Sequence, residues 1–427
     1  RRGSASAKPN APGSAAPQPS QDAGPADEAA EHDDLDKEAE KKVQYPPKPS
    51  HDMEKLTSGG GSTATEAASE ASVRWLFSVQ EKDGRWDAAK LGGRAGNDLE
   101  ATAWALLAIA SAGYTRYYHP YNEQLAKAIK WVETTVKPSE PDSGWSKNLR
   151  AHAVLTWAMW EFTRHGDDLY HLANLAHAHL MKHQAVFSGW PANAGDSRID
   201  LYTTAYAIQA MVATKANGVD ISEVRLVSPI RYLRSFFDKD GKILDGATNP
   251  EGLSARDSSA ALALSYMCLG YGRGNAAWES AVATIKANAP ADTTLASAGT
   301  PLQYLFVAGE VMKQVGGEDW TRWNDARLKL LVKPEDTQPK PTPPAEPAED
   351  EEPAPPVKPD PDAGKWASSP QDLLAAELGA VYSTALRVLM LGVYYRQEPL
   401  ERHLEYYELE DTDKGNTPPP PGDKPRE

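Results

Sequence analysis

The sequence has little of what several protein classes need. A single cysteine, Cys268, stands among 427 residues, which excludes an internal disulfide framework and a cysteine-based zinc cage. There is no run of 18 apolar residues, so the sequence predicts no membrane-spanning helix. The cysteine count does not fix the compartment, because exported proteins can also lack disulfides.

Basic residues are also in the minority. The net charge is −15, and most of it lies in three segments, 1–66, 337–362 and 397–427, which leaves a nearly neutral body. A nucleic-acid binder needs a basic face to displace counterions, and docking on anionic lipid needs one too. We therefore expect neither nucleic acid nor an anionic membrane surface as a partner.

The three acidic segments are predicted extensions of the folded body. Residues 1–66 are rich in Ala, Pro, Ser and acidic residues and too poor in large apolar ones to fold alone, so we expect a disordered tether. Residues 337–362 hold 10 prolines among 26 positions, which predicts a flexible polyproline II insert. Residues 397–427 are expected to be an acidic, Pro-rich tail. The sequence begins with Arg1 and not Met, so a signal or anchor upstream is expected to be missing. A long low-complexity arm ahead of a nearly neutral body favours a membrane-tethered or exported protein, without excluding a cytoplasmic one.

Between these extensions, small apolar segments recur about every 50 residues. Thr102, His152, Thr204, Ser259 and Thr384 fall in register within them. Each segment is apolar nearly all round and contains no internal proline, which is typical of buried helices. The copies lie at 98–107, 148–155, 200–208, 257–264 and 380–386, with a looser one at 301–314.

A second, amphipathic family alternates with the first. In 122–136 the apolar positions Leu125, Ile129, Val132 and Val136 follow a period of 3.6 residues. The members are 68–80, 122–136, 168–184, 223–237, 276–287 and 320–332. Six amphipathic outer helices around six buried inner ones predict an all-α (α/α)6 toroid over residues 67–396, and an open helical solenoid is the alternative.

A short motif follows the first amphipathic segment, with Gln80, Gly84 and Trp86 in the pattern Gln-x3-Gly-x-Trp. The glycine permits a turn after the helix, the tryptophan is an apolar plug, and the glutamine can bond backbone groups left open at a helix end. Degenerate copies lie at matching places and supply Gly144, Trp145, Gln184, Gly189, Trp190, Gly364 and Trp366, with a further one at 240–243.

These motifs resemble the QW repeat of the squalene cyclase and prenyltransferase superfamily. The stretches 316–324 and 381–396 are similar to bacterial prenyltransferase/squalene oxidase repeat proteins of unassigned activity. The resemblance implies a terpenoid-cyclase-like α/α toroid. It does not imply one chemistry, because function resides in the site and not in the fold.

The motifs that carry the known chemistries of this superfamily are missing from the sequence. There is no Asp-x-Asp-Asp for alkene protonation, and Asp167-Asp168-Leu169-Tyr170-His171 lacks the last acid of Asp-Asp-x-x-Asp, which would hold magnesium. Cys268 lies in an apolar run and does not suggest the Asp, Cys and His zinc site of protein prenyltransferases, and no Cys-Gly-Glu-Gln thioester string occurs. We therefore expect no cofactor, no metal and no assigned catalytic residue.

Polar and aromatic residues at the starts of the inner segments are the candidate rim or pocket residues. Two interpretations stay open for the acids: they are helix N-caps, or they face one another across a glycan-cleaving or ligand-binding site. His179 and His183 share one helix face, but without an evident third ligand. The rim candidates are Asp98, Glu100, Trp104, Arg150, His152, Asp200, Tyr202, Asp257 and Tyr382.

The sequence thus favours a non-catalytic binding or scaffold domain whose ligand is an unknown protein, lipid or glycan. The alternative is an enzyme that uses carboxylates at the rim on a glycan or an isoprenoid lipid. An open, aromatic-lined cavity of roughly 300–1,000 Å³ with two opposed carboxylates would favour the enzyme.

Overall fold

The structure is a computed structural model and describes residues 52–136, 147–186, 188–290, 301–333, 360–366 and 372–396. All of them belong to one compact unit, Pro46–Glu427. The predicted extensions 1–51 and 397–427, nearly all of the Pro-rich insert, and Gly144 and Trp145 lie outside the described residues.

The described residues form helices, and their only β-type pairing consists of isolated bridges such as Asn148 with Asn193. Each predicted inner segment forms a helix of 12 to 16 residues that is buried along most of its length. These helices are α4 (Asp98–Ser111), α6 (Leu149–Arg164), α8 (Leu201–Ala216), α11 (Ala255–Cys268), α14 (Leu302–Val315) and α17 (Ala380–Leu391).

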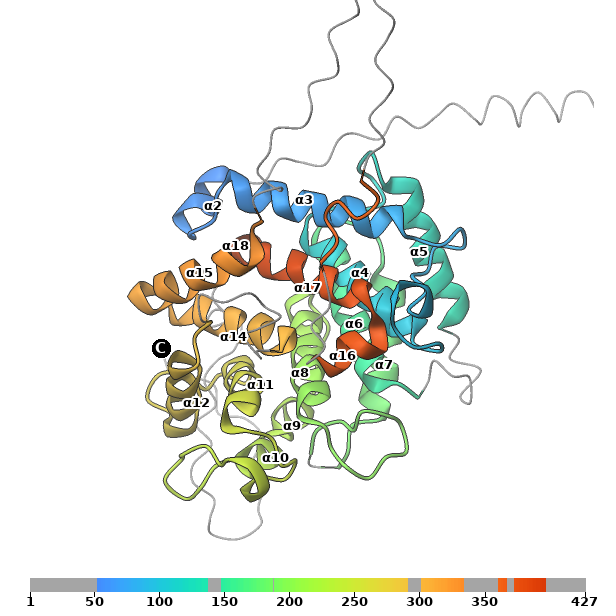
Figure 1. Ribbon diagram of the computed structural model, residues 1–427. Coiled ribbons are helices and arrows are strands. Elements are labelled where there is room, and N and C mark those ends of the chain that lie inside the picture. The colour runs from blue at the N-terminus through green and yellow to red at the C-terminus, as the bar shows by residue number, and fades with distance from the viewer. Residues whose placement is uncertain are drawn as a thin grey trace, which may run out of the picture. The chain divides into compact units, whose positions relative to one another are not determined.

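The inner helices form a closed ring. In chain order each of them contacts the next, and α17 contacts both α14 and α4 (Figure 1). The contact between the last and the first inner helix excludes an open solenoid, which would leave both end helices uncovered on one side. The predicted toroid is therefore confirmed by the helix contacts of this chain.

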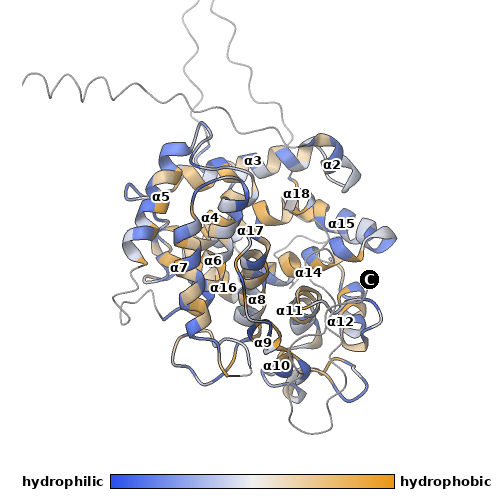
Figure 2. Cartoon of the chain, turned by 180° about the vertical axis from the view of Figure 1, so that it is seen from behind, coloured by the Kyte–Doolittle hydropathy of each residue, from blue (hydrophilic) through white to orange (hydrophobic). Residues whose placement is uncertain are grey.

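The amphipathic helices lie outside the ring. Their apolar stripe packs against inner helices, and Figure 2 shows α15 as largely hydrophilic beside the mostly hydrophobic α14. The outer helices are α3 (Thr63–Ser78), α5 (Asn122–Thr135), α7 (Tyr170–Lys182), α9 (Glu223–Val227), α10 (Ile230–Arg234), α12 (Ala276–Ala287) and α15 (Gly317–Leu331). The predicted helix 223–237 is split into α9 and α10 because Pro229 lies between them and cannot continue the first helix.

Five short helices complete the described part. They are α2 (Met53–Ser58), α16 (Leu373–Leu378), α18 (Val393–Arg396) and two 3-10 turns, Ala89–Leu91 and Gly246–Thr248. No helix among the described residues is long and apolar enough to cross a membrane.

The prediction that the tether extends to residue 66 is wrong for residues 52–66. Asp52 caps α2, and the Trp320 indole Nε1 donates to the Gly59 carbonyl at 2.9 Å while Asn324 Nδ2 donates to Gly60 at 2.8 Å. Gly60 has a φ of +95°, and a Cβ there would lie 2.8 Å from the Asn324 amide. Gly59 and Gly60, which lie inside the predicted tether, are what allow the backbone to approach these side chains.

Candidate functional site

The turn that follows α3 holds two helices together. Gln80 Nε2 donates to the carbonyls of Gly84 at 2.8 Å and Gln124 at 3.0 Å, so the glutamine joins its own turn to α5. Trp86 is fully buried, and its indole N–H donates to the Leu76 carbonyl at 2.7 Å. The motif residues thus have structural partners.

The threonines that recur in register in the inner segments accept hydrogen bonds from the turns that contain the motif tryptophans. The backbone N–H of Trp86 donates to the Thr102 hydroxyl at 3.0 Å, and Trp190 pairs in the same way with Thr204 at 3.0 Å. A third copy of this bond joins Trp366 to Thr384 at 3.0 Å. The sequence showed both periodic features but not that they bond to each other.

The other motif positions lie in equally tight places. Gln184 Nε2 donates to the Arg225 carbonyl at 2.8 Å, and a Cβ on Gly189 would lie 2.2 Å from the Thr204 hydroxyl. Gly364 has a φ of +88°, and a Cβ there would lie 2.0 Å from the Ala71 carbonyl oxygen. Only glycine fits these two approaches.

The centre of the ring is occupied by aromatic side chains. The Trp104 ring lies edge-on to Tyr206, Tyr382 and Phe306, with centroid distances of 5.2, 5.4 and 6.2 Å. Trp157 stacks on Phe306 at 6.3 Å, and all five side chains are buried. Burial raises the pKa of Tyr382 far above its usual value, so this phenol stays neutral.

Two of the rim candidates form a buried ion pair. The Glu100 carboxylate accepts from Arg150 Nε at 2.5 Å and Nη2 at 3.1 Å, and from Asn148 Nδ2 at 2.8 Å. The Glu100 side chain is 1% exposed and Arg150 is 16% exposed. Burial by itself would lower the pKa of Arg150. The negative charge of Glu100 and its hydrogen bonds with the guanidinium outweigh burial, so the pKa of Arg150 is raised. Glu377 lies 3.3 Å from the same guanidinium.

The capping interpretation is right for only one of the three aspartates. Asp200 caps α8 and accepts from the Thr203 amide at 2.7 Å. Asp98 is already helical and accepts from the Ala88 amide and from Arg85 Nε, each at 3.0 Å. Its carboxylate therefore holds the preceding loop against the start of α4.

Asp257 was the third predicted cap, and Ser254 takes that role in α11. The Asp257 carboxylate pairs instead with Arg256 Nε at 2.8 Å, and its carbonyl accepts from the Tyr202 hydroxyl at 2.8 Å. Tyr202 in turn lies beside Tyr206, with centroids 6.2 Å apart. The structure thus links Tyr202 and Asp257 to the aromatic centre.

His152 lies against α7. Its ring centroid is 4.2 Å from that of His179, and His179 is 4.7 Å from His183. Even so, no group of three His, Cys, Asp or Glu side chains in the described ranges could hold a metal ion. His177, on the same helix, has its pKa lowered to about 4 by burial.

Asp372 is a buried acid that the sequence analysis did not single out. One carboxylate oxygen accepts from the amides of Leu374 and Ala375, at 3.0 and 3.1 Å, and the other accepts from Leu302 at 3.0 Å. One side chain therefore caps both α16 and α14. Burial raises its pKa, against the opposing effect of these amides. An Asp directly before Leu373-Leu374 was a capping signal in the sequence.

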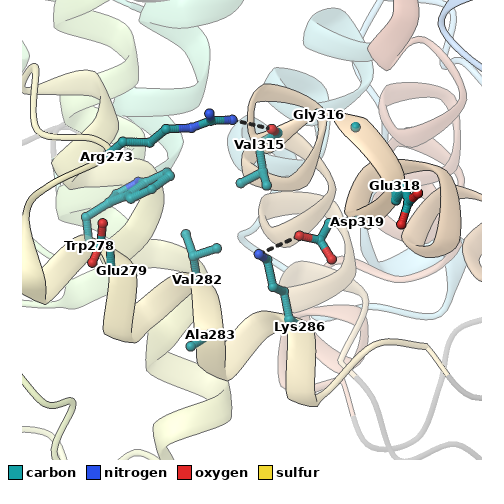
Figure 3. Close-up of a pocket in the computed structure, with 11 residues that line it drawn as sticks. Arg273, Trp278, Glu279, Val282, Ala283, Lys286, Val315, Gly316, Glu318 and Asp319 are labelled. Carbon is teal, nitrogen blue, oxygen red and sulfur yellow. Dashed lines mark hydrogen bonds and ion pairs between the residues drawn. The ribbon is translucent and has the colours of Figure 1, made fainter.

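In the described part of the chain, hollows lie between outer helices at two places. A groove of about 580 Å³ runs between α12 and the start of α15, with Arg273 at one end and the Lys286–Asp319 ion pair, 2.5 Å apart, at the other (Figure 3). A smaller hollow of about 370 Å³ is lined by residues of α5 and α7, among them Glu133 and His171. Neither hollow reaches the aromatic centre through its lining residues.

No protein-family model and no curated protein matches the sequence. Among solved structures, the chain is similar to a variant of a type II terpene cyclase from Scytonema, solved in complex with its substrate geranylgeranyl dihydroxybenzoate. The sequence identity is 14% and the TM-score is 0.46, and the match covers 80% of this chain and 98% of the cyclase chain.

Proposed function

We propose that this chain is a non-catalytic binding or scaffold domain built on a squalene cyclase/prenyltransferase-like toroid. The observation that carries the proposal is the packed centre, where the Trp104 ring contacts Tyr206, Phe306 and Tyr382 and all four side chains are buried. A cyclase or a glycosidase needs a chamber at this position that admits a substrate. Partners would then bind to the outside of the ring.

The partners of the rim acids support the same proposal. A carboxylic acid that protonates a substrate must reach it, whereas both oxygens of Glu100 accept bonds from Arg150 and Asn148. Asp98 and Asp200 likewise hold backbone amides. The oxygens of these carboxylates are therefore bonded within the chain, as in side chains that have a structural role.

The enzyme remains a second candidate because of one observation. The Tyr382 hydroxyl and the Trp104 indole N–H are buried and have no hydrogen-bond partner among the described residues. Buried polar groups are nearly always bonded, so a pair of unbonded ones marks a place where a polar ligand atom would be stabilised. Such a ligand would have to displace the aromatic packing to reach them.

Product analysis by mass spectrometry tests the proposal. The full chain is incubated with squalene, with linear prenyl diphosphates and magnesium, and with oligosaccharides, and we expect no product. Turnover that is abolished in Glu100→Gln but kept in Glu377→Gln would establish the enzyme instead. Glu377 is the matched control, because it also contacts Arg150 but is 37% exposed.

The wider assignment belongs to the same proposal. The glutamine, glycine and tryptophan turns support a place among the bacterial prenyltransferase/squalene oxidase repeat proteins. The N-terminal arm would tether the ring to a membrane or an exported assembly, where it would bind a protein, lipid or glycan. Fractionation of cells that express the full-length gene product tests this, and recovery in the cytosol alone would contradict it.

A further inference from the structure

Lys313, on α14, has aromatic partners but no acidic one. Its ammonium nitrogen lies 5.2 Å from the centroid of the Trp320 ring and 5.8 Å from that of Tyr394. In the part of the chain that the structure describes, its side chain makes no hydrogen bond and has no carboxylate within 4 Å. Lys286, by comparison, is paired with Asp319 at 2.5 Å. The faces of two rings are therefore what stabilises the charge of Lys313.

Two other cations act on this amine. The central carbon of the Arg327 guanidinium lies 5.2 Å from the centroid of the Trp320 ring and 5.8 Å from that of Tyr394, and Arg327 is fully buried. Lys55, on α2, is exposed. Burial of Lys313 and the charges of Arg327 and Lys55 lower the pKa of the Lys313 amine below its usual value. A larger fraction of the amine is therefore neutral at a given pH, and the neutral amine is the nucleophile.

The amine of Lys313 lies next to the end of α2. A Cβ on Gly59, the C-cap of α2, would lie 3.0 Å from Lys313 Nζ. The helix α2 contacts α18 (Figure 1), and Leu56 is the buried residue of α2, whereas its other residues are exposed. Because Lys313 is partly exposed and the helix beside it is thin, a small reagent has a route to the amine from solvent.

We propose that Lys313 is a modification site that accepts a small activated acyl group, such as that of an acyl phosphate. The neutral amine attacks the carbonyl carbon, a C–N bond forms and the C–O bond to the phosphate breaks. Phosphate leaves with the electron pair of that bond, and the proton of the amine passes to solvent. The site lies outside the ring centre, so it stands whether the chain is a scaffold or an enzyme.

Acylation of Lys313 would loosen α2. The ammonium becomes a neutral amide, so its attraction to the two rings is lost. The acyl group also adds bulk at a nitrogen that lies only 3.0 Å from where a Cβ on Gly59 would be. We expect α2 to move away, which breaks the bond that the Trp320 indole N–H donates to the Gly59 carbonyl at 2.9 Å.

Labelling of the full chain with acetyl phosphate, followed by peptide mass spectrometry, tests the proposal. Lys215 is the matched control, because it is also partly exposed and, within the described ranges, has neither a carboxylate nor an aromatic ring as a partner. At pH 8 we expect Lys313 to be acetylated at least threefold faster than Lys215. The ratio of the two rates should fall as the pH approaches about 10.4, where ordinary lysines also lose their proton. A difference in access alone would leave this ratio constant.

Two variants complete the design. Lys55→Glu replaces a cation by an acid in the first turn of α2, where an acid is favourable, and should slow acetylation of Lys313 severalfold at pH 8 without changing Lys215. Lys313→Gln imitates the acylated side chain and should speed amide hydrogen exchange across 53–58. Equal rates for Lys313 and Lys215, a ratio that does not change with pH, or an unchanged rate in Lys55→Glu would each overturn the modification site. Unchanged exchange in Lys313→Gln would overturn its effect on α2.

Discussion

Replacing Arg150 by Met tests the buried ion pair between α4 and α6 most directly. The change leaves the Glu100 carboxylate, which is 1% exposed, with Asn148 as its remaining donor at 2.8 Å. Breaking a buried pair from one side costs about 3–5 kcal/mol. Because Arg150 is 16% exposed and Asn148 keeps its bond, we expect the lower end of this range, about 3 kcal/mol.

Guanidinium unfolding followed by circular dichroism measures the loss as a lower midpoint at constant slope. The double variant Glu100→Leu with Arg150→Met removes both charges from the site and should recover most of the stability. Two results would refute the view that an unpaired buried carboxylate causes the effect. One is a stability loss in the double variant that nearly equals the sum of the losses in Glu100→Leu and Arg150→Met, and the other is a loss below about 1 kcal/mol for Arg150→Met alone.

Three further changes test other parts of the reasoning. Gly84→Ala should destabilise the chain by more than about 2 kcal/mol in thermal unfolding, because its Cβ would lie 2.3 Å from a backbone carbon. The control Gly92→Ala has a similar φ but open space around it, and should cost only about 1 kcal/mol. Equal losses would contradict the steric argument. Thr102→Val should cost about 1–3 kcal/mol by denaturant unfolding, because it leaves the buried Trp86 amide unbonded, and a neutral change would show that this bond is dispensable. Burial lowers the pKa of His177 to about 4 in the folded chain, whereas the unfolded chain takes up this proton near pH 6.5. Protonation of His177 therefore does not affect stability above pH 6.5, and the free energy of unfolding should fall by roughly 2 kcal/mol as the pH drops toward 4. His177→Gln should remove that part of the pH dependence, and an unchanged pH profile would contradict it.

The sequence by itself determined the helices and their two classes. Spacings such as Leu125, Ile129 and Val132 fix which side of α5 is apolar, since a helix places residues three and four apart on one face. Segments that are apolar all round, such as α4, can only be buried. Six alternating pairs then leave few arrangements that cover every inner helix.

The tertiary structure alone decided what the side chains do. Glu100 and Arg150 are 50 residues apart, and only the packing of α4 against α6 brings them into contact. Asp257 looked like a cap from its position, but Ser254, three residues earlier, starts the helix. A capping residue is chosen by backbone geometry, which sequence pattern locates only within a few residues.

The same limit applied to the centre and the edge of the ring. Whether Trp104 lines a cavity or fills it depends on the distances to Tyr206 and Tyr382, which come from other helices. Glycines 59–61 lie inside the predicted tether, yet the Gly59 carbonyl accepts from Trp320, 261 residues away in the chain. Periodicity reports which face of one helix is buried. Contacts between segments distant in the chain depend on how the helices pack, which a local pattern does not contain.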